Sequence, residues 1–307
     1  RSKVVIRIIV FVYVGLTLIT TIALKYAGMC WFDAITHAMS ACSTCGFSTK
    51  NSSIVFFDSA TIETILMVAM TLAGIHFGVL YATLLGKRNN IFRSEIVRTY
   101  IGMLLIVSVA IAISLYGNDI YDSFSEAMRH STFQVVSYTT TSGFATADAN
   151  LWTPFAIVLL MFGSVVCGCA GSTSGGIKVD RMVIAAKVVR NRIKQQQHPN
   201  AVISTKIDGV VRDDGTQSIV MTFLVAYVML VLIGTIINAM FGCDLLTGFS
   251  AAIACISNVG PGFGEVGSMD NYSELPAILK LNASLLMLVG RLEIFGFIQL
   301  FFIRSWR

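Results

Sequence analysis

The sequence predicts an all-α integral membrane protein built from repeated pore-forming units. Of its 307 residues, 55% are hydrophobic and only 13% are charged, whereas a soluble domain carries about 25% charged residues. So few polar groups cannot cover a soluble globule of this size, which excludes a cytosolic enzyme as the default class. Two further observations carry the prediction: apolar spans alternate with shorter semi-polar stretches, and a short glycine-containing string recurs along the chain.

Several apolar stretches approach the roughly 20 residues needed to cross a hydrocarbon core. They are residues 4–24, 62–85, 101–115, 154–166, 219–240 and 275–303, some of them short or interrupted. Between them lie semi-polar stretches at 32–43, 125–136 and 245–257. These stretches are too short to cross a membrane and too apolar for simple loops. A half-helix that enters the membrane and turns back fits them.

The distribution of charge predicts the topology. Most of the 22 Lys and Arg residues lie in segments 1–7, 87–98, 178–212 and 304–307, and basic loops stay cytoplasmic. The alternate connections carry acidic residues, namely Asp58, Asp119, Asp122, Asp148, Glu265, Asp270 and Glu274. We therefore expect both ends inside and the half-helices entering from an acidic outer face. Such a face concentrates cations, although solvation of the outer loops also explains part of this charge.

A string with a central glycine follows each semi-polar stretch: STCGFST at 43–49, TTSGFAT at 140–146 and SNVGPG at 257–262. Each string occupies the same place in a unit of helix, half-helix, extended loop and helix. The units divide the chain into repeats at 1–95, 96–205 and 206–307. One such string would be noise, but a recurrence in the same topological position predicts a repeated structure.

Extended backbone at membrane depth is tolerated only along a watery path or inside protein, and carbonyls facing an axis can replace the hydration shell of a cation. Glycine suits such a loop because it accepts positive φ and adds no side chain to the lumen. The half-helices would also aim their negative C-terminal ends at the ion. The candidate ion-binding residues are Thr44, Cys45, Gly46, Phe47, Thr141, Ser142, Gly143, Phe144, Asn258, Val259, Gly260 and Pro261. For any single glycine, an ordinary turn remains the simpler interpretation.

The stretch 155–192 is too rich in glycine and serine to form one helix, since glycine costs about 1 kcal/mol relative to alanine in a helix interior. We expect it to unwind and to line a cavity or be covered by protein. Tight helix packing through small residues is the structural alternative. A nucleotide-binding loop fits poorly because the string lacks the Gly-Lys-Ser/Thr ending and a preceding strand.

Arg291 is the basic residue deep in the last apolar stretch, where a charge costs roughly 2.5–3.5 kcal/mol. It should face protein or a watery path, as a fixed positive charge below the filter. The alternative is a pair with helix carbonyls or with Glu293, although residues two apart do not share a helix face. His76 fits a buried histidine with a hydrogen-bond partner better than an ion relay. The spacing of Cys42 and Cys45 fits small residues at a crowded backbone better than a metal or redox pair.

These strings resemble the filter loops of the Trk/Ktr/HKT superfamily of potassium transporters, most specifically at 258–262. Residues 168–178 and 288–294 are most similar to the bacterial Trk pore-subunit family. The resemblance implies potassium permeation through a pseudo-four-fold pore, obstructed below the filter by an intramembrane loop and Arg291. The implied gate residues are Cys167, Gly168, Cys169, Ala170, Gly171, Ser172, Thr173, Ser174, Gly175, Gly176 and Arg291. The family has four units and this sequence has three, so we expect a unit before residue 1 and no conduction by this segment alone.

The resemblance further implies a homodimer in the bacterial cytoplasmic membrane and a TrkA-like cytosolic ring of nucleotide-binding subunits. Potassium would be the substrate; no covalent cofactor, nucleic acid or enzyme activity is expected, and nucleotide would act only through the ring. The basic run 190–198 could contact anionic lipid or the ring. An ion-coupled secondary transporter is the alternative, but it predicts inverted repeats. An intramembrane protease would need Ser172 or Ser174 beside a histidine, and His76 is the only histidine available on a span.

Overall fold

The computed structural model describes residues 2–86, 90–198, 204–270 and 272–301. The described chain is helical apart from one antiparallel hairpin, β1 (Thr205–Ile207) and β2 (Val210–Arg212). The first helices are α1 (Ser2–Tyr26), α2 (Trp31–Ser43), α3 (Ala60–Ala73) and α4 (Phe77–Leu84). They are followed by α5 (Glu95–Gly117), α6 (Phe124–Thr139), α7 (Pro154–Val166) and α8 (Val179–Gln197). The last are α9 (Asp214–Met240), α10 (Leu245–Ser257), α11 (Ala277–Arg291) and α12 (Ile294–Phe301). Short 3₁₀ turns lie at η1 (Ser53–Phe57), η2 (Ala149–Leu151), η3 (Gly264–Val266) and η4 (Tyr272–Glu274).

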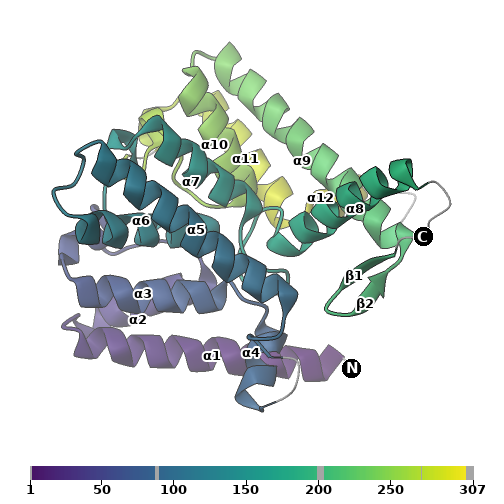
Figure 1. The fold of residues 1–307 in the computed structure, drawn as a ribbon. Helices are drawn as coiled ribbons and strands as arrows, with labels where there is room; N and C mark the ends of the chain where they lie inside the picture. Colours follow the sequence, from purple (N-terminus) through teal and green to yellow (C-terminus); the bar gives the residue numbers. More distant parts are fainter. Residues whose placement is uncertain (1, 87–89, 199–203, 271, 302–307) are drawn as a thin grey trace.

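Three short helices, α2, α6 and α10, form at the predicted semi-polar stretches. Each one packs between the helices that precede and follow it in the chain: α2 on α1 and α3, α6 on α5 and α7, and α10 on α9 and α11. Figure 1 shows these groups side by side, from the purple first group to the yellow-green last one. The α10 sequence is dominated by Ala, Ser, Gly and Cys, and most of its residues are buried. Small side chains let neighbouring helices approach closely.

The expected membrane class is supported by long apolar helices. Within the described residues, α1, α5 and α9 are long and apolar enough to cross a membrane, and α7 and α10 are shorter apolar helices. The start of α1, helix α8 and the β1–β2 hairpin lie on one side of the molecule (Figure 1). The tip of the hairpin fixes the start of α5, because Asp208 accepts hydrogen bonds from the Glu95 backbone at 2.6 Å and the Ser94 hydroxyl at 3.2 Å.

The apolar stretch 62–85 is one of the interrupted ones and does not form a single continuous helix. It forms α3 and α4, which meet at an angle of 103°. The backbone leaves the helix at Gly74, and His76 caps α4 by accepting a hydrogen bond from the Gly78 N–H at 2.9 Å. His76 is exposed, so the expectation of a buried histidine is wrong, although its ring does have a backbone partner.

The last apolar stretch is also broken, between α11 and α12, where Glu293 adopts a φ of 51°. The stretch 275–303 is therefore also interrupted within its described part, and residues 302 and 303 lie outside the described residues. The predicted interruption within 155–192 is confirmed, because α7 ends at Val166 and α8 begins at Val179.

An ion pair with a buried carboxylate joins the first group to the second. The Glu63 carboxylate on α3 accepts two hydrogen bonds from the Arg129 guanidinium on α6, at 2.7 and 2.8 Å. The Glu63 side chain is only 3% exposed. A planar guanidinium and a carboxylate fit one another in this two-bond geometry, so the pair fixes the orientation of α6 relative to α3.

Candidate functional site

The three glycine strings have the same backbone conformation at the ends of α2, α6 and α10. The residue two before each glycine is left-handed, with φ of 54° at Thr44, 60° at Thr141 and 59° at Asn258. The next N–H donates to the carbonyl five residues earlier, at 3.0, 2.9 and 2.9 Å for Cys45, Ser142 and Val259 respectively. The glycines follow with φ of 71°, 77° and 103° for Gly46, Gly143 and Gly260. The repeated string is thus a repeated structure.

The strings meet around one cavity of about 450 Å³. A Cβ atom built on Gly46 would collide with the Ser142 carbonyl oxygen, and one on Gly143 would collide with the Val259 carbonyl oxygen. Neighbouring strings therefore approach through backbone alone. The predicted residues that line this cavity are Cys45, Gly46, Phe47, Ser142, Gly143, Val259, Gly260 and Pro261.

The other predicted filter residues lie behind the cavity wall. Thr44, Thr141, Phe144 and Asn258 are not among its lining residues. Phe144 is fully buried and stacks on the ring of His37, with 5.9 Å between ring centroids. Phe47 is the equivalent residue of the first string, and it is 81% exposed. The two phenylalanines therefore have different environments.

Side chains of each half-helix brace the string that follows it, and the sequence analysis missed this role. In the first unit, Asp33 accepts from the Thr49 hydroxyl at 2.6 Å, and the His37 Nε2 lies 2.8 Å from the Ser48 Oγ. In the second unit, His130 contacts Thr146 and Gln134 donates to the Ala147 carbonyl. In the third unit, Ser250 contacts the backbone of Phe263, and Thr247 accepts from the Glu265 N–H.

The cavity between the strings, which we call the outer cavity after the orientation expected from the sequence, has mixed charges rather than purely acidic ones. Lys50 and Asp270 both line it. The Lys50 ammonium lies 3.5 Å from the Asp33 carboxylate and 4.8 Å from the centre of the Phe56 ring. Asp33 thus neutralises a cationic side chain that would otherwise repel an entering cation. Tyr272 also lines the cavity and donates to the Gly260 carbonyl at 3.0 Å.

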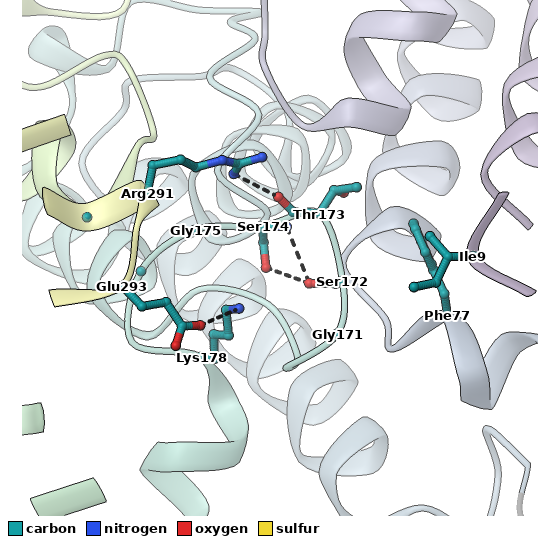
Figure 2. Close-up of a pocket in the computed structure, with 12 residues that line it drawn as sticks. Ile9, Phe77, Gly171, Ser172, Thr173, Ser174, Gly175, Lys178, Arg291 and Glu293 are labelled. Carbon is teal, nitrogen blue, oxygen red and sulfur yellow. Dashed lines mark hydrogen bonds and ion pairs between the residues drawn. The ribbon is translucent and has the colours of Figure 1, made fainter. Parts of the chain in front are cut away.

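A second cavity of about 340 Å³ lies along the unwound segment between α7 and α8. Its predicted lining residues are Gly171, Ser172, Thr173, Ser174, Gly175, Gly176 and Arg291 (Figure 2). Cys167, Gly168, Cys169 and Ala170, also predicted for the gate, do not line it. Both cysteines are buried, Gly168 lies against the Gly74 carbonyl, and the Ala170 N–H donates to Asp180 at 2.6 Å.

This segment (residues 167–178) contacts the break between α3 and α4. We call it the gate loop, after the role expected from the sequence. The Gly74 carbonyl accepts from the Cys169 N–H at 2.8 Å, and the Ala73 carbonyl accepts from the Thr173 backbone and hydroxyl. In the opposite direction, the Phe77 N–H donates to the Gly171 carbonyl at 3.2 Å. The bend in the apolar stretch 62–85 therefore frees helix-end groups, and the gate loop satisfies them.

Arg291 faces the second cavity. A buried arginine, as its depth in the last apolar stretch suggests, is therefore corrected, whereas the expectation that it faces protein or a watery path is not contradicted. Helix α11 ends at this residue, and the side chain is exposed and donates to the Thr173 carbonyl at 3.3 Å (Figure 2). Glu293 instead pairs with Lys178 at 3.3 Å and with Arg181 at 2.7 Å. The expectation that Glu293 is a poor partner for Arg291 agrees with this arrangement.

Comparisons with known proteins agree on one family. The TrkH family model, described as "Cation transport protein", matches residues 1–305. The chain is 35% identical over 297 residues to the Trk system potassium uptake protein TrkH of Salmonella typhimurium, which covers 96% of this chain and 61% of that protein. It is 33% identical to TrkG of Escherichia coli, covering 92% of this chain and 58% of that protein.

The crystal structure of the potassium transporter TrkH from Vibrio parahaemolyticus superimposes with a TM-score of 0.89 at 32% identity. The match covers 97% of this chain and 64% of that one. The chain thus spans about three fifths of the length of the curated relatives that it matches.

Proposed function

Because this chain belongs to the TrkH family of cation transport proteins, we propose that it forms the larger part of a potassium-permeation pathway. Its relatives are named potassium uptake proteins, and membership of a transport family is consistent with a protein that is not an enzyme. The observation that carries the proposal is the meeting of three strings, equal in backbone conformation, around one cavity. Potassium is the cargo of this pathway.

In this proposal the outer cavity is the entrance to a selectivity filter. Carbonyl oxygens of the strings take the place of the hydration shell of the ion, and the negative ends of α2, α6 and α10 attract it. A fourth loop of the same kind would close the ring. The activity therefore belongs to the full-length natural protein, and the tests below use that protein.

The gate loop and Arg291 form the proposed barrier below the filter. The loop is held by α3 and α4 at one side and by Arg291 at the other. A positive charge beside a narrow path opposes the passage of cations.

We further propose that the protein is a homodimer in the bacterial cytoplasmic membrane, with its basic face and both ends of this segment inside. Exposed Arg190, Arg192 and Lys194 on α8 suit contact with a TrkA-like nucleotide-binding ring or with anionic lipid.

A coupled secondary transporter is the second candidate, because α3–α4, α7–α8 and α11–α12 are all broken. Broken helices at midplane are typical of such transporters. Against it, the half-helices α2, α6 and α10 each lead into a string of the same conformation and in the same chain direction. The protease alternative receives no support, since the described hydrogen bonds of Ser172 and Ser174 involve no histidine.

Cys45 offers a native test of the outer cavity, since it is exposed and lines it. In the full-length protein with Cys30 and Cys243 replaced by serine, a cationic methanethiosulfonate reagent added from outside should remove most potassium uptake. Its bulk and charge would fill the entrance, and saturating potassium should slow the reaction. The matched control is Cys45→Ser in the same background, which should be insensitive. Full modification of Cys45 with undiminished uptake would place the ion path elsewhere.

A further inference from the structure

We propose that Thr141 couples the gate loop to the filter, through a hydrogen bond from the backbone of the loop to the Thr141 hydroxyl. This inference rests on the proposed function. The Thr141 hydroxyl oxygen accepts a hydrogen bond from the Gly175 N–H at 3.0 Å, and both groups are buried. Thr141 belongs to the second string, two residues before Gly143, whereas Gly175 belongs to the gate loop. This bond joins the second string directly to the gate loop.

The equivalent residues of the other strings have different partners. The Thr44 hydroxyl donates to the Ser43 carbonyl in its own turn, at 2.7 Å. The Asn258 amide donates to the carbonyls of Ile256 and of Met287 on α11. All three residues share the same left-handed conformation, so the backbone does not explain the difference. The position of the gate loop does.

The gate loop lies beneath the ends of all three half-helices. The Thr173 hydroxyl donates to the Cys42 carbonyl at the end of α2, at 3.1 Å. A Cβ on Gly175 would collide with the Ser257 carbonyl at the end of α10. At α2 and α10 the loop touches main-chain groups that belong to the helix ends. At the third string it also meets the Ser257 side chain, through Cys167. Within the described part of the chain, Thr141 is the string side chain that accepts a hydrogen bond from the backbone of the loop.

This arrangement gives the gate loop a direct effect on the filter. While the loop is in place, Gly175 holds the Thr141 hydroxyl and with it the turn that orients Ser142 and Gly143. When the loop leaves, that hydroxyl loses its partner. Thr141 is thus a positioning residue, whose side chain registers whether the loop is seated. A typical buried hydrogen bond corresponds to a factor of about five in the equilibrium between seated and displaced loop.

The test uses Cys167 and Cys169, which are 0% and 1% exposed and report directly on seating of the loop. In the full-length protein, modification by an aqueous thiol reagent is followed at each cysteine by peptide mapping. We expect Thr141→Val to speed the modification of Cys169 about fivefold. Thr44→Val, the matched control at the equivalent position, should leave the rate unchanged. Thr141→Ser keeps the hydroxyl and should behave like the natural protein.

Equal rates in Thr141→Val and Thr44→Val, or equal acceleration in both, would overturn the proposal. Elution as a single species in size-exclusion chromatography checks that each variant is folded. If Thr141→Val does not fold, the pair Thr141→Ser and Thr141→Ala, which differ only in the hydroxyl, gives the same comparison. The readout is loop accessibility rather than ion flux, so it does not depend on the identity of the ion. Failure of the proposed function would instead appear as unaltered selectivity when Gly143 is replaced.

Discussion

Replacing Gly143 with serine is expected to abolish most of the preference for potassium over sodium. Gly143 has a φ of 77°, which side-chain-bearing residues adopt at a cost, and a Cβ there would collide with the Val259 carbonyl oxygen. Relief of the collision must displace the backbone of the second or third string, and with it the carbonyls that would replace the hydration shell. Relative uptake of rubidium and sodium by the full-length variant in proteoliposomes measures the effect.

Gly102→Ser is the matched control for this substitution. Gly102 lies within α5, and a Cβ at this position has no atom within 4 Å. It should retain the natural selectivity and flux. A folded Gly143→Ser protein with unchanged selectivity would remove the second string from the filter and would contradict the proposed function.

Replacing Arg291 with alanine is expected to raise basal potassium flux by roughly tenfold or more. A unit charge about 8 Å from a cation opposes it by about 2 kcal/mol at an effective dielectric constant of 20. The substitution also removes the hydrogen bond that holds the Thr173 carbonyl of the gate loop. Both effects act in the same direction. Flux of rubidium into proteoliposomes, without any activating partner, is the measurement.

Arg291→Lys separates the charge from the hydrogen-bonding geometry, because lysine keeps the charge but not the planar guanidinium. Flux near the natural level in Arg291→Lys, with high flux in Arg291→Ala, would assign the barrier to charge. If a folded Arg291→Ala protein showed natural flux, Arg291 would have a purely structural role.

The three strings were predictable from sequence because their conformation depends on local features. Each has a glycine three or four residues after the end of a half-helix, and the structure gives Gly46, Gly143 and Gly260 positive φ in every case. The interruption near Gly168 was predictable for a similar reason, since glycine and serine gather where a helix cannot continue.

The bracing residues of the half-helices were harder to identify because their side chains differ in kind. His37 and Gln134 each lie nine residues before the glycine of their string, and both form hydrogen bonds with the residues after it. Asp33 and His130 each lie thirteen residues before the glycine of their string, and both contact a residue after it. An alignment of the three repeats on their glycines would have found these pairs, whereas a search for a shared residue type could not.

The break at Gly74 and the exposure of Arg291 depend on contacts between distant parts of the chain. The stretch 62–85 is apolar enough for one helix, and only the gate loop, about a hundred residues later, supplies partners for the freed carbonyls of Ala73 and Gly74. Similarly, Arg291 lies at the end of α11 because the chain turns at Glu293. The Glu293 carboxylate forms ion pairs with Lys178, just before α8, and with Arg181 in its first turn. Hydropathy contains no information on such pairings.

The most direct test of the central claim is cation uptake by the full-length protein in proteoliposomes, comparing rubidium, potassium, sodium, lithium and choline. The account predicts that potassium and rubidium enter in preference to sodium and lithium, that choline is excluded, and that no second ion need be supplied. Uptake that requires a sodium or proton gradient would contradict a pore and favour the coupled transporter. Entry of all these cations at equal rates would contradict a filter formed by the strings at Gly46, Gly143 and Gly260.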